Sequence, residues 1–251
     1  MHRFFAASIQ EGRARLDGEE AGHLSRVLRL GPGDEVIACD GAGRDYRARV
    51  LQAEAKQALL ELIEPMDNAA EPRLRVTLYQ GLPKAGKLET VIQKATELGA
   101  ARVVPIQAAR SVVKIQPDRQ GERVARYQRV AYEACKQCGR ARVPEVSAPM
   151  SFAQAEGMLR GHETLLLPWE QAREGSLYAA LAAARDAGAP VGDVGLVIGP
   201  EGGLAPEEVA YLEGLGAKTV TLGARILRTE TAAVAALACV MFALGEMGGW
   251  R

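Results

Sequence analysis

The sequence predicts an α/β protein made of two parts, a small β-barrel and a larger domain built on a parallel sheet. Residues 1 to about 66 form short apolar segments separated by Gly and Asp turns, a pattern typical of strands. From residue 73 onward, strand-like and helix-like segments alternate, which is typical of a parallel sheet covered by helices on both faces. With 251 residues, the chain is long enough for one or two domains.

The first part contains four predicted strands and one short helix. The strands are Arg3–Phe5, Asp34–Cys39, Asp45–Gln52 and Ala58–Glu64. The helix has Glu19 and Glu20 in its first turn, Leu24, Val27 and Leu28 on its apolar side, and Gly31-Pro32 at its end. The segment Met66–Pro72 then loses all periodicity and is predicted to be a linker. We therefore place the domains at residues 1–70 and 73–251.

The second part contains five predicted strands and five predicted helices. The strands are Leu74–Tyr79, Arg102–Ile106, Thr164–Leu167, Val194–Ile198 and Thr219–Leu222. The helices lie near Lys87–Leu98, Asp118–Cys138, Leu177–Ala187, Pro206–Gly214 and Glu230–Gly245. Their alternation predicts a single parallel sheet.

Composition excludes several classes of protein. The N-terminus lacks the apolar core of a signal peptide, and the longest apolar runs fall far short of the roughly 20 residues that span a bilayer. We therefore expect a cytoplasmic protein without a membrane segment. Cys135 and Cys138 have the spacing of zinc and redox motifs, but no second pair follows and the three histidines are scattered. We expect no metal.

The net charge of zero conceals a local excess of cations. The segment from Arg110 to Arg142 contains nine basic residues and only three acidic ones. Steps of three and four residues place Arg119, Arg126, Arg129 and Arg140 on one face of the predicted helix, together with Glu133. Such a stripe suits contact with a phosphate backbone, although a charged helix face that is only solvated remains an alternative.

Two blocks near the C-terminus carry the strongest functional signal. Ile198-Gly-Pro-Glu-Gly-Gly203 follows a predicted strand, and its glycines allow a ligand to approach the main chain. The loop has neither the Gly-Lys-Ser/Thr of a P-loop nor the spacing of the Rossmann fingerprint, so phosphate binding fits poorly. A tight turn without a ligand is the alternative.

The second block is Leu222-Gly-Ala-Arg-Ile-Leu-Arg-Thr-Glu-Thr231. Thr229 or Thr231 is expected to cap the last helix, and Glu230 suits its positive end. Arg225 and Arg228 are not needed for structure, and an arginine there suits a phosphate or a base edge. The alternative is a solvated turn. A weaker feature is His23-Leu-Ser-Arg-Val-Leu-Arg29, in which Arg26 and Arg29 are expected to lie one helical turn apart.

With these residues, the chain resembles the SPOUT methyltransferases, and within them the bacterial family that methylates N3 of a uridine in 16S ribosomal RNA. The blocks that carry the resemblance are His23-Leu-x-x-Val-Leu-Arg29, Lys94-Ala-Thr-Glu-Leu-Gly99, Glu133-Ala-x-x-Gln-Cys-Gly-Arg140 with Val143-Pro144, Gly199-Pro-Glu-Gly-Gly203 and Leu222-Gly-x-Arg-Ile-Leu-Arg-Thr-Glu-Thr-Ala232. They extend over nearly the whole chain, and the last block is highly specific.

The resemblance implies an N-terminal PUA-like β-barrel that binds RNA and a C-terminal SPOUT α/β domain with a trefoil knot. It also implies a homodimer and S-adenosylmethionine as cofactor. The cofactor would be held mainly by backbone groups of Leu167, Pro168, Trp169, Ile198, Gly199, Pro200, Glu201, Gly202, Gly203, Leu222, Gly223, Ile226, Leu227 and Thr231. The expected RNA contacts are Arg26, Arg29, Arg119, Arg126, Arg129, Arg140 and Arg225.

The target base suggests roles for three side chains. Uracil N3 carries a proton and pairs within a helix, so the base must be exposed or flipped and N3 must be deprotonated. We expect Arg228 to stabilise negative charge on the uracil carbonyl oxygens or to hold the nearby phosphate. Either Glu133 or Glu201 then accepts the proton, directly or through water.

The sequence is also compatible with two other functions. A catalytically silent RNA-binding factor for ribosome assembly would share the barrel and the basic helix but would not bind S-adenosylmethionine. A nucleotide-dependent α/β enzyme would use the glycine loop for phosphate, which the missing lysine disfavours.

Overall fold

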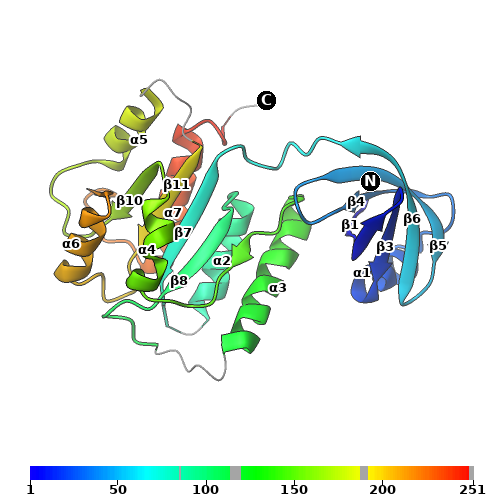
Figure 1. Cartoon of the computed structure of the whole chain (residues 1–251), viewed down its shortest axis with the longest axis horizontal. Helices are drawn as coiled ribbons and strands as arrows, with labels where there is room; N and C mark the ends of the chain where they lie inside the picture. The colour runs from blue at the N-terminus through cyan, green and yellow to red at the C-terminus, as the bar shows by residue number, and fades with distance from the viewer. Residues whose placement is uncertain (85, 114–119, 187–191, 249–251) are drawn as a thin grey trace. The chain divides into compact units, whose positions relative to one another are not determined.

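The computed structural model describes residues 1–84, 86–113, 120–186 and 192–248. The chain divides into two compact units (Figure 1). The first unit combines Met1–Glu71 with Cys135–Val143, and the second combines Pro72–Ala134 with Pro144–Arg251. The first unit thus includes a short segment that follows it in the sequence by more than sixty residues.

The first unit is built on a six-stranded sheet. Its strands are β1 (Arg3–Phe5), β2 (Ser8–Gln10), β3 (Arg13–Asp17), β4 (Glu35–Cys39), β5 (Asp45–Ala53) and β6 (Gln57–Met66), in the order β1-β4-β5-β6-β3-β2. The two end strands do not pair with each other within the described part of the chain, so the predicted barrel is a curled open sheet. The prediction missed β2 and β3, because β3 has only Ala14 and Leu16 as inward-facing apolar residues.

The short helix of this unit differs from the prediction in its second half. α1 (Gly18–Gly22) continues into a π-helical turn, η1 (His23–Val27), in which the Leu28 N–H donates to His23 O. The wider turn leaves Leu24 buried but turns Val27 outward, with 68% of the side chain exposed, so the expected apolar side was wrong at Val27. Arg29 lies beyond the helix with φ 55°, and it therefore does not share a helical face with Arg26.

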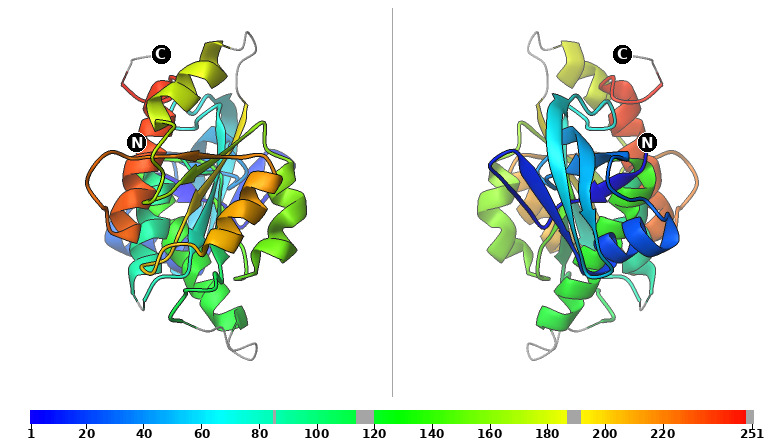
Figure 2. Two further views of the ribbon diagram at one scale, coloured as in Figure 1. Left: turned by 90° about the vertical axis from the view of Figure 1, so that its left-hand side faces the viewer. Right: turned by 90° about the vertical axis from the view of Figure 1, so that its right-hand side faces the viewer.

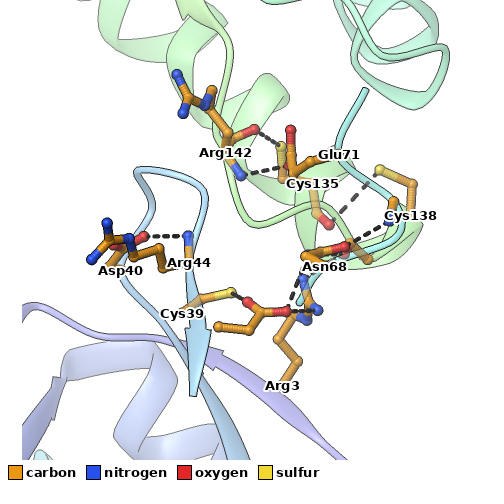
Figure 3. A network of polar contacts seen from close by, with 12 residues as sticks. Arg3, Cys39, Asp40, Arg44, Asn68, Glu71, Cys135, Cys138 and Arg142 are labelled. Atoms are coloured by element: carbon orange, nitrogen blue, oxygen red, sulfur yellow. Dashed lines mark hydrogen bonds and ion pairs between the residues drawn. The ribbon is translucent and has the colours of Figure 1, made fainter. Parts of the chain in front are cut away.

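A buried carboxylate organises one end of the first unit. Asp45 is 2% exposed, and it pairs with Arg3, which Figure 3 labels close to Cys39 and Asn68. It also accepts hydrogen bonds from Cys39 Sγ at 2.8 Å and from Asn68 Nδ2 at 3.0 Å. Burial raises the pKa of Asp45, although the Cys39 and Arg3 contacts oppose that rise. Each buried polar atom here has a partner, as a stable site of this kind requires.

The predicted linker Met66–Pro72 is not a free connection. β6 runs to Met66, and Asn68 Nδ2 also donates to Gly139 O at 3.1 Å. The Glu71 carboxylate accepts from the Arg142 N–H at 2.7 Å and pairs with Arg140 at 3.2 Å. These contacts fix residues 135–143 to the first unit, and a loss of hydrophobic periodicity in the sequence could not reveal them.

The second unit is built on a parallel sheet in the order β12-β10-β11-β7-β8-β9. Its strands are β7 (Arg75–Gly81), β8 (Arg102–Ile106), β9 (Glu145–Val146), β10 (Thr164–Pro168), β11 (Asp193–Ile198) and β12 (Ala217–Val220). The helices are α2 (Lys87–Glu97), α3 (Gln120–Cys138), α4 (Phe152–Arg160), α5 (Leu177–Asp186), α6 (Pro206–Gly214) and α7 (Thr229–Ala243). Every strand pair is parallel, which confirms the predicted class of sheet.

Helices cover both faces of this sheet. On one face, α4 and α6 pack with Tyr79, Val197 and Leu167 into one hydrophobic cluster. On the other face, α7 packs against β7, β11 and α2. The left view in Figure 2 shows α7 and α6 on opposite sides of the strands. The prediction missed β9, which has two residues, and α4, whose central Gly157 weakens the helical pattern. None of the helices in the described ranges is long and apolar enough to cross a bilayer.

A buried hydrogen-bond chain crosses the α4 side of the sheet. Tyr79 Oη lies 2.8 Å from His162 Nε2, and His162 Nδ1 pairs with Asp193. We expect Tyr79→Phe to destabilise the protein by about 1–3 kcal/mol, because the buried imidazole nitrogen loses its partner. Urea denaturation measures this loss. Tyr178→Phe is the matched control, since Tyr178 is 79% exposed, and equal stability of the two variants would contradict the prediction.

Candidate functional site

The loops predicted to bind the cofactor converge at one edge of the sheet. β12, β10 and β11 are neighbouring parallel strands, so their carboxyl ends lie side by side. These ends lead into residues 222–227, into Pro168-Trp169 and into Gly199–Gly203. β7 is the next neighbour of β11, and its end leads into Leu82–Lys84. Ligands of open α/β sheets bind beyond the carboxyl ends of the strands, so this edge is the candidate site.

The glycine loop after β11 packs so closely against its neighbours that a side chain has no room at Gly81 or Gly203. A Cβ on Gly81 would lie 2.5 Å from Pro200 N and 2.8 Å from Gly199 C. Gly203 has φ +68°, and a Cβ there would lie 2.2 Å from the carboxylate of Glu170. The loop is therefore held against the end of β7 by backbone contact, which only glycine at position 81 permits.

Thr229 holds the same loop from the other side. Its hydroxyl donates to Gly199 O at 2.6 Å and accepts from Gln80 Nε2 at 2.8 Å, and the residue is 5% exposed. The expected capping by Thr229 or Thr231 was wrong, because Arg228 occupies the N-cap position and no side-chain cap forms. The Thr229 hydroxyl instead connects β7, the glycine loop and α7.

Removal of that hydroxyl tests this connection. We expect Thr229→Val to cost about 1–3 kcal/mol of stability, because Gly199 O and Gln80 Nε2 each lose a buried partner while the side-chain shape is conserved. Chemical denaturation measures the cost. Thr231→Val is the control at an exposed position of the same helix turn. An unchanged Thr229→Val protein would show that the loop does not depend on this bond.

The second block presents its side chains outward. Gly223 has φ +106° with open space around its Cα, and Ile226 is 84% exposed. Arg225 and Arg228 are also exposed, and Thr231 lies exposed in the first turn of α7. Within the described part of the chain, Arg228 forms no ion pair.

A charged cluster joins three segments at this edge. Lys87 Nζ lies 3.1 Å from Glu201 Oε1 and 3.2 Å from Glu230 Oε2. Burial alone would raise the pKa of Glu201, but hydrogen bonds from the Lys84 N–H and from Lys87 outweigh it and lower that pKa. The pKa of Glu230 is lowered by its own backbone N–H and then by Lys87. Glu201, one of the two expected proton acceptors, is therefore already bound by Lys87 and by the Lys84 N–H.

Glu133, the other expected acceptor, lies away from this edge. Gln120, at the start of α3, lines a pocket with Gln107, which follows the carboxyl end of β8. Gln128 Oε1 accepts from Val146 N, and Val146 pairs with Val103 near the amino end of β8. With a rise of ~1.5 Å per residue, Glu133 lies about 20 Å along α3 from its first residue. One copy of the chain does not bring Glu133 together with Arg228.

The predicted cationic stripe is only partly present. Arg126 is exposed but pairs with Glu89, and Arg129 is exposed on the same helix. Arg119 lies outside the described residues. Arg140 lies beyond the end of α3, is 3% exposed and pairs with Glu71, so the structure contradicts its place on the stripe. A helical pattern continued past Gly139, where φ is +80° and the helix has ended, caused this error.

The remaining predicted cofactor residues are mostly buried or partly buried. Leu167 is fully buried, and Ile198 is 3% exposed. Trp169 packs partly buried against the hydrophobic cluster under α6, and its main-chain N–H donates to Val220 O at 3.0 Å. Sequence reasoning missed Gln80, Gly81 and Lys87. The signal available for them was another glycine directly after an apolar strand, followed by a lysine at a helix start.

Comparison with known proteins defines the class of protein. Residues 70–241 match the model of an RNA methyltransferase domain, and residues 16–63 match that of an RNA methyltransferase PUA domain. The protein is therefore an RNA methyltransferase with a PUA domain.

Relatives narrow the family. The chain is 34% identical over 227 residues to the ribosomal RNA small subunit methyltransferase E of Bacillus subtilis, covering 90% of this chain and 89% of the relative. The corresponding Neisseria gonorrhoeae enzyme, solved bound to S-adenosyl methionine, is 29% identical with a TM-score of 0.79, and 96% and 97% of the two chains are covered. A Legionella pneumophila methyltransferase solved with the same cofactor is 30% identical with a TM-score of 0.79, covering 96% and 97%. The chain belongs to the ribosomal RNA small subunit methyltransferase E family.

This membership confirms the predicted family and fold class. The first unit is a PUA-like curled sheet, and the second is an RNA methyltransferase domain built on a parallel α/β sheet. The trefoil knot, the domain boundaries and the roles of individual site residues stay predictions. Among the described residues, no group of three or more His, Cys, Asp or Glu side chains is arranged to hold a metal ion.

Proposed function

We propose that this protein transfers the methyl group of S-adenosylmethionine to N3 of a uridine in 16S ribosomal RNA of the small subunit. The observation that carries the proposal is the carboxyl edge of the second sheet, where two glycine loops and the exposed Arg228 meet. Two relatives have been solved with this cofactor bound. Because the substrate is ribosomal RNA, we place the reaction in the cytoplasm.

The residues at this edge fit the proposed cofactor. Gly223 is exposed with open space where a Cβ would stand, and three of the five residues from Gly199 to Gly203 are glycines, which carry no side chain of their own. Exposed Ile226 supplies an apolar surface for an adenine or a methionyl chain. S-adenosylmethionine, when bound, supplies an electrophilic methyl group on a sulfonium.

Methylation of N3 needs a proton acceptor and stabilisation of negative charge. As the N3–H bond breaks, charge spreads onto the two uracil carbonyl oxygens, and Arg228 is placed to hold it or the adjoining phosphate. N3 then forms its bond to the methyl carbon while the carbon–sulfur bond breaks toward sulfur. Arg225 and the exposed arginines Arg26, Arg29, Arg126 and Arg129 bind the RNA backbone in this proposal.

Which residue accepts the proton depends on whether one or two chains form the site. Glu201 shares the edge with Arg228 but is held by Lys84 N and Lys87, whereas Glu133 of the same chain lies far from it. In a homodimer, Glu133 of a second copy would be available to the site. We therefore propose a homodimer, and light scattering of the purified protein measures its mass directly.

Two measurements test the function. The purified protein should bind S-adenosylmethionine in calorimetry, and 16S RNA from cells lacking the gene should lose one N3-methyluridine by mass spectrometry. Absence of cofactor binding would favour a silent assembly factor. Persistence of the modified uridine in the deletion strain would exclude this substrate.

A further inference from the structure

The first residue of α2 is electrostatically unfavourable for its position. Lys87 directly follows Gly86, the N-cap residue, which has φ 85°. A helix N-terminus carries a partial positive charge and prefers acidic residues, so a lysine there costs rather than contributes helix stability. A local preference that the fold overrides is expected where function demands it.

The contacts of Lys87 offset this unfavourable position. Its ammonium lies 3.1 Å from Glu201 in the glycine loop and 3.2 Å from Glu230 in the first turn of α7. The Glu201 carboxylate also accepts from the Lys84 N–H, at 3.0 and 3.3 Å from its two oxygens. One ammonium thus joins the start of α2, the loop after β11 and the start of α7.

The two carboxylates belong to the two halves of the candidate site. Glu201 lies between Pro200 and Gly202 in the loop proposed to hold the methyl donor. Glu230 lies two residues after Arg228, the residue proposed to face the uracil. Without a cation between them, the two negative side chains would repel, which favours a shift of the loop relative to the start of α7.

We propose that Lys87 is a positioning residue for methyl transfer. Through Glu201 and Glu230, it fixes the position of the cofactor loop relative to Arg228. This inference rests on the proposed function. Lys87 touches neither proposed substrate in this arrangement; it acts only through the two carboxylates. The buried Gln80–Thr229–Gly199 bonds hold the same elements from beneath, so loss of Lys87 should disturb the geometry without unfolding the protein.

The test compares Lys87→Met, Lys87→Arg and Lys94→Met in the full-length protein. Lys94 is a matched control, because it lies in the same helix and pairs locally with Glu97 at 2.9 Å. We measure the Kd for S-adenosylmethionine by calorimetry, kcat and KM on small-subunit RNA, and Tm. We expect Lys87→Met to raise the Kd and lower kcat, each by about 10-fold, since small misplacements of reacting groups cost this much or more. Lys87→Arg should recover most of both, and all Tm values should stay close to wild type.

A second comparison separates positioning from a general structural role. In a Glu201→Gln background, Lys87→Met should add less than about half of its effect on the Kd, because the link it breaks is already weakened. Additive effects of the two substitutions, or a Lys87→Met protein indistinguishable from Lys94→Met, would overturn the role of Lys87. Wild-type protein without any affinity for S-adenosylmethionine would instead overturn the proposed function, and the role of Lys87 with it.

Discussion

Arg228→Ala is expected to lower kcat by about 10²–10³-fold while the Kd for S-adenosylmethionine changes little. This is the range found when one donor that stabilises developing charge is removed from an active site. The exposed guanidinium stands at the N-cap of α7 and forms no ion pair among the described residues, so it is available to a ligand. Its removal leaves no buried partner unsatisfied, and stability should not change.

Two further substitutions sharpen the test of Arg228. Arg228→Lys should recover only part of the turnover, because an ammonium lacks the planar pair of donors that a guanidinium offers to two oxygens. Arg225→Ala should raise the KM for RNA more than it lowers kcat, since Arg225 is proposed to bind the RNA backbone only. Single-turnover assays on small-subunit RNA separate these effects. Unchanged turnover in Arg228→Ala would remove this residue from the mechanism.

Gly81→Ala is expected to damage both stability and cofactor binding. The added methyl group would stand 2.5 Å from Pro200 N and Cδ, a separation that real Cβ atoms do not show, so the glycine loop must move away from β7. Forcing an extra carbon into a closely packed site costs about 1–3 kcal/mol. Because the displaced loop is the proposed cofactor site, the affinity for S-adenosylmethionine should fall as well.

Gly157→Ala provides the matched control for this substitution. Gly157 lies inside α4 with open space around its Cα, and alanine in a helix interior is favoured over glycine by about 0.5–1 kcal/mol. The same chemical change should therefore raise the midpoint of urea denaturation at position 157 and lower it at position 81. Equal midpoints and equal cofactor affinities would show that the close approach of Gly81 to Pro200 is unimportant.

The alternation of strands and helices in the second part of the chain was sufficient to predict its sheet. Thr164–Leu167 and Val194–Ile198 are continuous apolar runs, which are typical of strands buried on both faces, and both lie within observed strands. The glycine loop followed from the same logic, since an apolar strand that ends in glycines offers a main-chain surface. Local pattern therefore located the edge of the sheet at which the site lies.

Properties that depend on contacts across the chain could not be predicted in this way. The burial of Arg140 depends on Glu71, and the role of the Thr229 hydroxyl depends on Gly199, which is thirty positions away. Val27 was misplaced because a π-helical turn changes the periodicity on which the prediction rests. In each case, the outcome depends on the folded chain, and the local sequence pattern does not show it.

Residues 135–143 have a consequence for how the molecule can be divided. Because this segment packs with residues 1–71, the main chain passes between the two units three times. A protease that cut only near Glu71 would separate residues 1–71 covalently from the rest, but residues 135–143, which belong to the same unit, would stay in the other fragment. A recombinant fragment starting at residue 73 would carry Arg140 without Glu71 and Gly139 without Asn68. The two units are thus better regarded as co-folding parts than as separable modules, and the full-length chain is the form to purify.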